Sequence, residues 1–198
     1  MQQFYDLMEA YARADTDEVR QQIQDQVWEE YGVEETVLII DMSGFSRLTQ
    51  KRGIVHYLSM VRHMQLVTQP IIERFGGAVV KYEADNAFCR FPVVQKAIDA
   101  SISINIAFDA MNMMTQDDLN IYISCGIDHG RFLLVDNSDF FGSVVNIASK
   151  LGEDIGSAGD VLVTKSAMAL LPDGVVFNSE EKSYEISGVN IEAQRITF

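Results

Sequence analysis

The sequence predicts an α+β fold, a ferredoxin-like antiparallel sheet with helices that is preceded by an N-terminal helical pair. Two observations carry this prediction: helical and strand patterns alternate along the chain, and the first 33 residues are charged and favour helix. The chain has 198 residues and is 47% apolar, enough for one domain with a filled core. We therefore expect a helical segment at 1–33 and a single domain at 34–198.

The helical segment is divided by Asp15-Thr16-Asp17, which predicts an N-cap for a second helix. That helix carries Val27, Trp28 and Tyr31, and Gly32 should end it. Residues 1–33 are a candidate contact for a regulatory partner, and the sequence does not define their role.

The first strand is expected at the apolar run 37–40, a pattern typical of a strand buried on both faces, and it ends in Asp41. Ser43-Gly44 breaks the strand, and Phe45 lies where the chain resumes at helical spacing. The backbone amides of residues 42–45 should point outward at a helix N-terminus, where an anion is favoured. The alternative is that this acid and turn form only a helix cap.

The central part predicts a helix and a hairpin. Apolar residues recur at steps of three and four over 54–75, which indicates one long amphipathic helix that Pro70 should kink or divide. Gly76-Gly77 ends it, and strands at 78–82 and 87–91 should form a hairpin with Asp85 near its tip.

The remainder predicts a helix from Pro92 to about residue 114 and a strand at 121–127. A turn at Asp128-His129-Gly130 should lead into a partner strand at 131–135, followed by a helix at 141–151. After residue 159 short strands alternate with one helix at 165–171. With the helices on one face of the sheet, Asp41 and Asp85 could meet at one edge and hold a divalent metal.

Charge and cysteine usage narrow the class of protein. Acids outnumber Lys and Arg by 29 to 15, and the net charge of −14 disfavours binding to nucleic acid or to an anionic membrane. Cys89 and Cys125 lie in strand-like runs without metal-ligand spacing, so we expect buried free thiols in a reducing compartment. No signal peptide or membrane span is evident, and we expect a cytoplasmic protein.

Three stretches of the chain together resemble the class III nucleotidyl cyclase catalytic domain, the adenylate and guanylate cyclase family. They are VLIIDMSGFSRLT, GGAVVKYEADNAFCRF and DFFGSVVNIASKL, in the family's order and spacing, and the resemblance covers residues 36–198. It implies the class III cyclase catalytic fold. It also implies attack of a ribose 3′-hydroxyl on the α-phosphorus of a nucleoside triphosphate, which releases pyrophosphate and closes a cyclic 3′,5′-monophosphate.

The resemblance further implies a metal site. Asp41 and Asp85 would hold two Mg²⁺ or Mn²⁺ ions with the carbonyl of Met42. From the free amides at the turn, we separately expect Ser43, Gly44 and Phe45 to bind the substrate.

The resemblance also implies residues that recognise the nucleotide. Lys81 and Asp139 occupy the base-reading positions, and a lysine donor with a carboxylate acceptor suits adenine. Asn146 matches the ribose-positioning residue and Arg131 an arginine that contacts the triphosphate. Lys150 stands where the family usually has an arginine that stabilises charge in the transition state.

Two further departures affect turnover. Ser187-Gly188-Val189 lacks a phosphate-binding lysine of the family, and Glu83-Ala84 replaces an apolar-Gly pair before Asp85.

The leading hypothesis is an adenylate cyclase that converts ATP to cyclic AMP as a homodimer. The metal aspartates and the phosphate arginine would come from one protomer, and the base, ribose and transition-state residues from the other. One alternative is a degenerate cyclase domain that binds nucleotide or a partner without efficient turnover. Another is a cyclase for another nucleotide, such as a pyrimidine one.

Overall fold

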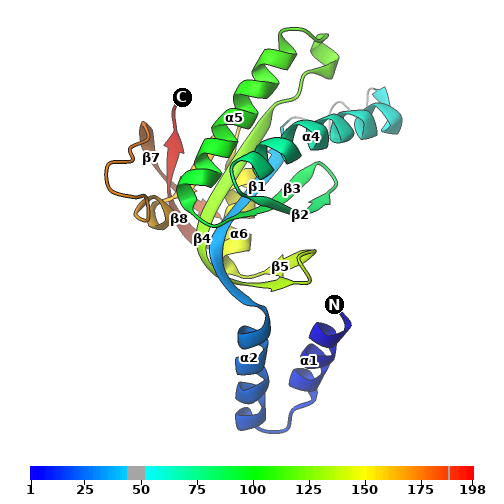
Figure 1. The fold of residues 1–198 in the computed structure, drawn as a ribbon, viewed down its shortest axis with the longest axis vertical. Coiled ribbons are helices and arrows are strands. Elements are labelled where there is room, and N and C mark those ends of the chain that lie inside the picture. The colour runs from blue at the N-terminus through cyan, green and yellow to red at the C-terminus, as the bar shows by residue number, and fades with distance from the viewer. Residues whose placement is uncertain (44–51, 187) are drawn as a thin grey trace.

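The computed structural model describes residues 1–43, 52–186 and 188–198 and confirms the α+β fold class. Its described strands form one eight-stranded sheet in the order β2-β3-β1-β4-β6-β8-β7, with β5 paired to β4 (Figure 1). The sheet is mixed, because β6 (Val161–Thr164) runs parallel to β4 (Ile123–Val135) while the other pairings are antiparallel.

The N-terminal helical pair is present as predicted. Helices α1 (Gln2–Arg13) and α2 (Asp17–Tyr31) hang below the sheet in Figure 1. The Thr16 hydroxyl accepts a hydrogen bond from the Val19 amide at 3.3 Å, which confirms the expected N-cap. Phe4 and Val27 pack against Val135 of β4, so a small apolar cluster, separate from the main core, holds the helical pair to the sheet.

The central strand is β1 (Gly32–Met42), which lies between β3 (Asn86–Phe91) and β4. Its apolar run 37–40 is fully buried, as the sequence predicted. The expected hairpin is formed by β2 (Ala78–Glu83) and β3, and Ala84 at its tip has φ +51°, a region that non-glycine residues seldom adopt.

Helices cover both faces of the sheet, which corrects the expectation of one covered face. Helices α4 (Ile54–Arg74) and α5 (Val94–Asn112) pack on the face of Leu38 and Ile40. Helix α6 (Ser143–Ser149) packs on the opposite face, against Val37 and Ile39. Successive residues of a strand face opposite sides of the sheet, so the apolar run 37–40 must be covered on both sides. The long helix α4 continues through Pro70 and is not divided there.

Strand β4 corrects a second prediction. Residues 128–130 do not turn; they continue the strand, and Asp128, His129 and Gly130 pair with Val37, Thr36 and Glu35 of β1. Because β1 begins at Gly32, its residues 32–37 offer backbone partners to residues 128–133 of β4, and this pairing overrides the local turn signal. The strand therefore runs unbroken for 13 residues.

The segment after β4 also differs in detail from the prediction. Phe141 belongs to the short strand β5 (Asp139–Phe141), so α6 begins only after Gly142. The helix then widens into a π-helical turn, η2 (Lys150–Ile155). A short 3₁₀ turn, η1 (Asp117–Leu119), lies where a loop was expected.

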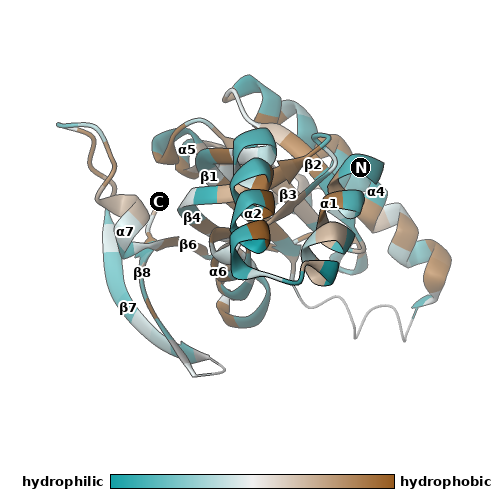
Figure 2. Ribbon diagram, turned by 90° about the horizontal axis from the view of Figure 1, so that it is seen from below, coloured by the Kyte–Doolittle hydropathy of each residue, from teal (hydrophilic) through white to brown (hydrophobic). Residues whose placement is uncertain are grey.

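The C-terminal part completes the sheet with α7 (Lys165–Met168), β7 (Ser179–Ile186) and β8 (Val189–Ile196). Figure 2 shows the hydrophilic β7 at the margin and the hydrophobic central strands between helices. Both cysteines are free and buried, as expected. None of the described helices is long and apolar enough to cross a membrane.

Candidate active site

The structure brings the two predicted metal acids together at the end of β1. Asp41 pairs in register with Asn86 of β3, and Asp85 directly precedes Asn86 at the hairpin tip. Burial, followed by the nearby charges of Asp85 and Glu153, raises the pKa of Asp41 to about 7. The acid end of β1 therefore holds negative charge that a cation would stabilise.

Two residues next to this acid pair carry side-chain oxygens without partners among the described residues. Ser43 Oγ and Asn86 Oδ1 are buried and have no hydrogen-bond partner within the described part of the chain. Divalent ions such as Mg²⁺ bind carboxylate and neutral oxygens, so this donor set fits them. No group of three or more His, Cys, Asp or Glu side chains could hold a metal among residues 1–43, 52–186 and 188–198. Further ligands would have to be backbone, water or substrate oxygens.

Glu153 of η2 is an acid that the sequence analysis did not select. Burial raises the pKa of Glu153, and Asp154, Asp85 and Glu83 raise it further, while a hydrogen bond with Ser149 opposes them. In the sequence, only its position just after the helix of Asn146 could have pointed to Glu153. The π-helical turn that brings Glu153 toward Asp85 has no sequence signature.

Two glycines let α6 and η2 approach the strands closely. A Cβ on Gly126 of β4 would lie 2.0 Å from the Ala148 carbonyl oxygen, and one on Gly152 would lie 3.1 Å from the Ile39 carbonyl oxygen. The Ser124 hydroxyl also donates to the Gly152 carbonyl at 2.7 Å. The close approach holds Glu153 beside the acid end of β1.

The two predicted base-reading residues also meet. The Lys81 ammonium lies 3.1 Å from Asp139 Oδ1 and 2.9 Å from Glu83 Oε2, and 4.9 Å from the centroid of the Phe88 ring. Burial lowers the pKa of Lys81, but hydrogen bonds and charge from Glu83 and Asp139 outweigh it and leave the pKa above its usual value. The Phe140 amide donates to the same Asp139 Oδ1 at 2.9 Å.

Asn146 and Lys150 lie four residues apart, on α6 and at the first position of η2. Asn146 is exposed, and Lys150 is half-buried. Lys150 forms no ion pair with Glu153 or Asp154, or with any other residue that the structure describes. Among the described residues, Lys150 therefore does not form an ion pair within its helix.

Arg131 is not brought to the acid pair of its own chain. It pairs with Glu34, seven residues before Asp41 on β1, a separation of ~23 Å along the strand. Its guanidinium lies 4.9 Å from the centroid of the Trp28 ring of α2, as a cation–π pair.

Of four other predicted positions, the structure describes only Ser43. The Ser43 amide donates to the Tyr122 carbonyl at 2.8 Å. Gly44, Phe45 and Ser187 lie outside the described residues.

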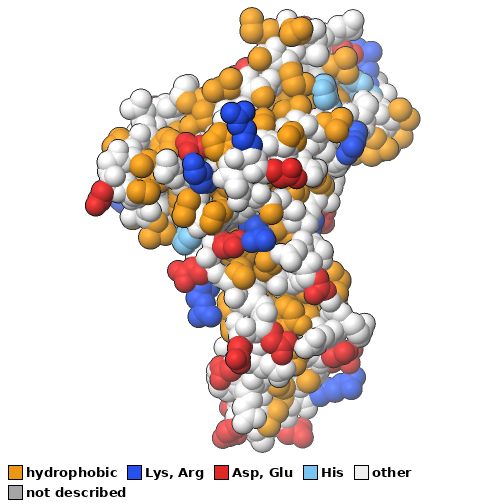
Figure 3. Space-filling view, viewed as in Figure 1, with side chains coloured by type: hydrophobic (Ala, Val, Ile, Leu, Met, Phe, Trp, Pro, Cys, Tyr) orange, Lys and Arg blue, Asp and Glu red, His pale blue; other side chains and the backbone are white. Residues whose placement is uncertain are grey.

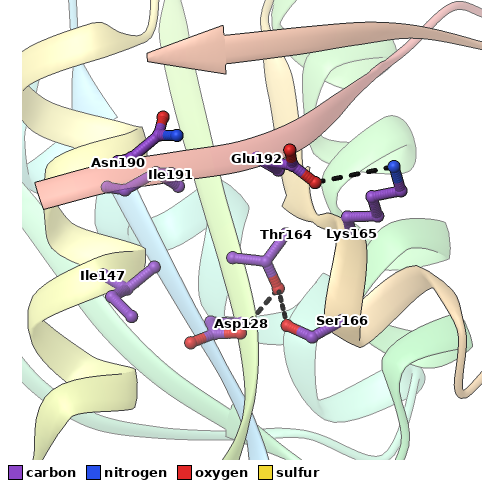
Figure 4. Close-up of a pocket in the computed structure, with 8 residues that line it drawn as sticks. All are labelled: Asp128, Ile147, Thr164, Lys165, Ser166, Asn190, Ile191 and Glu192. Carbon is purple, nitrogen blue, oxygen red and sulfur yellow. Dashed lines mark hydrogen bonds and ion pairs between the residues drawn. The ribbon is translucent and has the colours of Figure 1, made fainter. Parts of the chain in front are cut away.

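A cavity of about 420 Å³ lies elsewhere, between α6, α7 and β8 (Figure 4). At its floor the Thr164 hydroxyl donates to the buried Asp128 carboxylate at 2.6 Å. Its lining contains no predicted site residue, so the candidate site is the end of β1 at Asp41 together with the Lys81–Asp139 pair, and not this cavity.

Known proteins resemble this chain in sequence and in fold. The family described as "Adenylate and Guanylate cyclase catalytic domain" matches residues 29–198. A protein of Rhizobium meliloti (strain 1021) whose name calls it an adenylate cyclase is 28% identical over 129 residues, which are 65% of this chain. The chain spans only 22% of that relative's length.

Solved structures share the fold. The guanylyl cyclase Cya2 has a TM-score of 0.72 at 14% identity, over 83% of this chain and 92% of that one. The adenylyl cyclase CyaB from P. aeruginosa has a TM-score of 0.71 at 18% identity, over 84% and 96%. An adenylate/guanylate cyclase/hydrolase from Silicibacter pomeroyi has a TM-score of 0.69 at 26% identity, over 83% and 96%. With the family match spanning most of the chain, the protein belongs to the family of adenylate and guanylate cyclase catalytic domains, class III.

Proposed function

We propose that the protein is an adenylate cyclase, which converts ATP to cyclic 3′,5′-AMP and pyrophosphate. The observation that carries the choice of ATP is the contact between Lys81 and Asp139. Two of the three ammonium hydrogens of Lys81 are directed to carboxylates, which leaves one donor. Asp139 Oδ1 accepts from Lys81 and from the Phe140 amide, and no described residue donates to Oδ2.

A remaining donor beside a remaining acceptor matches the edge of adenine. Adenine presents an acceptor at N1 and a donor at its exocyclic N6 amine. Guanine reverses both, with a donor at N1 and an acceptor at position 6. Guanine bound against Lys81 and Asp139 in the same pose would leave mismatched groups, at a cost of about 1–3 kcal/mol for each.

The acids at the end of β1 are proposed to hold two Mg²⁺ or Mn²⁺ ions. Asp41, Asp85 and the carbonyl of Met42 would be the protein ligands, and the partnerless oxygens of Ser43 and Asn86 support an oxygen-rich site. Such ions, when bound, lower the pKa of the ribose 3′-hydroxyl and neutralise the triphosphate.

Two side chains on α6 and η2 complete the proposed site. Asn146 would orient the ribose, and Lys150 would place a positive charge at the reacting phosphoryl group. Arg131 is left out of the proposed site, because the β1 register sets it far from Asp41.

The proposed active form is a homodimer in which one protomer supplies the acids and its partner supplies Lys81, Asp139, Asn146 and Lys150. Apolar side chains on the outer turns of α4 support a second copy (Figure 3). Ile54, Val55 and Leu58 are 60%, 78% and 55% exposed, and large neighbouring apolar groups in water usually mark an interaction surface.

The test is to incubate the purified protein with each of the four nucleoside triphosphates and Mn²⁺ and to identify products by mass. We expect cyclic AMP from ATP and at least tenfold less cyclic product from the others. In the same assay Asp41→Asn should give no cyclic product, whereas the matched control Asp173→Asn, a change at an exposed loop acid, should leave product formation unchanged. Preferential use of GTP would contradict the proposed base reading, and binding of ATP without any product would favour a degenerate domain.

A further inference from the structure

A second carboxylate holds the base-reading lysine. Lys81 and Glu83 are two residues apart on β2, so their side chains project from the same face of the strand. Their charged groups are 2.9 Å apart. The Lys81 and Asp139 side chains are 29% and 25% exposed, whereas that of Glu83 is 66% exposed. Glu83 is therefore the outer member of a three-residue group whose centre is the lysine.

We propose that Glu83 is a positioning residue for Lys81 and thereby contributes to the preference for ATP over GTP. The inference rests on the proposed function, because it concerns the same base-reading site. It assigns a role to a residue that the sequence analysis recorded only as a departure from the family pattern.

The Lys81 side chain is flexible unless several contacts hold it. Four rotatable bonds separate the Lys81 ammonium from the backbone, and a single carboxylate fixes such a chain poorly. Contact with Glu83 on one side, Asp139 on the other and the Phe88 ring restricts the ammonium to one place. One donor is then left at a fixed position, as recognition of adenine N1 requires.

Loss of Glu83 should act against ATP in particular. Without it the ammonium has only Asp139 as an anionic partner, and it can bridge both oxygens of that carboxylate. Oδ2 would then no longer be free to accept from the adenine N6 amine. A loosely held lysine can still donate to guanine O6, so the affinity for GTP should change less.

The β7 edge of the sheet offers a matched control. Glu180 and Lys182 are also two residues apart, their charged groups are 3.0 Å apart, and β7 is the edge strand opposite β2. Glu83→Ala and Glu180→Ala therefore remove the same kind of ion pair from the two edges of one sheet. Only the first lies beside the proposed site.

The experiment measures equilibrium dissociation constants of 3′-deoxy-ATP and 3′-deoxy-GTP, which lack the attacking hydroxyl, for the full chain with Mn²⁺. Since the ion pair is partly exposed, we expect Glu83→Ala to lower the ratio of ATP-analogue to GTP-analogue affinity by about threefold. Glu83→Gln should have an intermediate effect and Glu180→Ala none. In turnover with ATP, Glu83→Ala should raise KM and leave kcat nearly unchanged.

A second pair of variants tests whether Glu83 acts through Lys81. In a Lys81→Met background, Glu83→Ala should leave the affinity ratio unchanged, as a double-mutant cycle requires. An equal effect with and without Lys81, or an unchanged ratio in the Glu83→Ala single variant, overturns the inference. Failure of the proposed function looks different, because the unaltered protein would then make no cyclic AMP or would favour the GTP analogue.

Discussion

Replacing Asp41 with Asn should abolish cyclisation and at the same time stabilise the metal-free fold at pH 8. Asn has nearly the same shape and carries no charge. Burial and the nearby carboxylates raise the pKa of Asp41 from 3.8 to about 7, so above pH 7 the native protein contains an unfavourable negative charge. The substitution removes that charge.

The magnitude follows from the size of this pKa rise. About three pH units at 1.36 kcal/mol per unit give an upper limit of ~4 kcal/mol. The side chain is only partly buried, and screening by water and salt reduces the expected gain to about 1–2 kcal/mol.

The stability gain from Asp41→Asn should depend on pH. A carboxyl whose pKa is higher in the folded than in the unfolded state binds more protons when folded, so the wild-type protein loses stability as pH rises from 3.8 to about 7. The advantage of Asp41→Asn should therefore be full at pH 8, shrink as pH falls below 7 and be lost near pH 4.

The assay is urea unfolding in EDTA at pH 8, 6 and 4, for the wild type, Asp41→Asn and the control Asp173→Asn. Added Mn²⁺ should raise the free energy of unfolding of the wild type and of the control, but not that of Asp41→Asn. If Asp41→Asn were less stable than the wild type at pH 8, or kept near-normal cyclase activity, the reasoning about the acid pair would be refuted.

Three other predictions follow from the structure. Lys81→Glu combined with Asp139→Cys should cost ATP at least tenfold in kcat/KM, about 1.4 kcal/mol, and raise the relative rate with GTP; an unchanged ratio in steady-state assays would place the base elsewhere. Lys150→Arg should raise kcat by roughly tenfold with little change in KM, because a guanidinium adds aligned donors in the transition state, and Lys150→Ala should lower it. Equal single-turnover rates for the three proteins would exclude a catalytic role for Lys150. Gly126→Ala should cost at least about 2 kcal/mol in urea unfolding, since its Cβ would lie 2.0 Å from a backbone oxygen; a wild-type midpoint would contradict the close packing of α6 on β4.

Sequence patterns predicted those parts of the fold that depend on residues close together in the chain. The apolar run at 37–40 predicted a strand buried on both faces, and Thr16 predicted a helix cap that the structure forms. The turn predicted at residues 128–130 was wrong. Asp, His and Gly favour a turn in isolation, but here β1 offers them continuous backbone partners. The same apolar run implies that helices cover both faces of the sheet, whereas the prediction placed them on one face.

The candidate site was predictable where strand ends define it. Asp41 and Asp85 could be placed together because one ends a strand and the other is at a hairpin tip. Glu153 and Asn86 could not be selected, since their relevance depends on a π-helical turn and on the register between β1 and β3. Arg131 was matched by motif alone, and only the register of β4 on β1 shows its distance from the acids.

The strand order has a consequence for how the chain folds. β1 lies between β3 and β4, so Asp41 pairs with Asn86 on one side and with Ser124, 83 residues along the chain, on the other. Pairings between distant segments close large loops and form slowly, typically in milliseconds to seconds. Until β1 has joined β3, its terminal carboxylate is an ordinary solvated acid apart from Asp85. We therefore expect added divalent ions to slow unfolding while leaving the refolding rate unchanged.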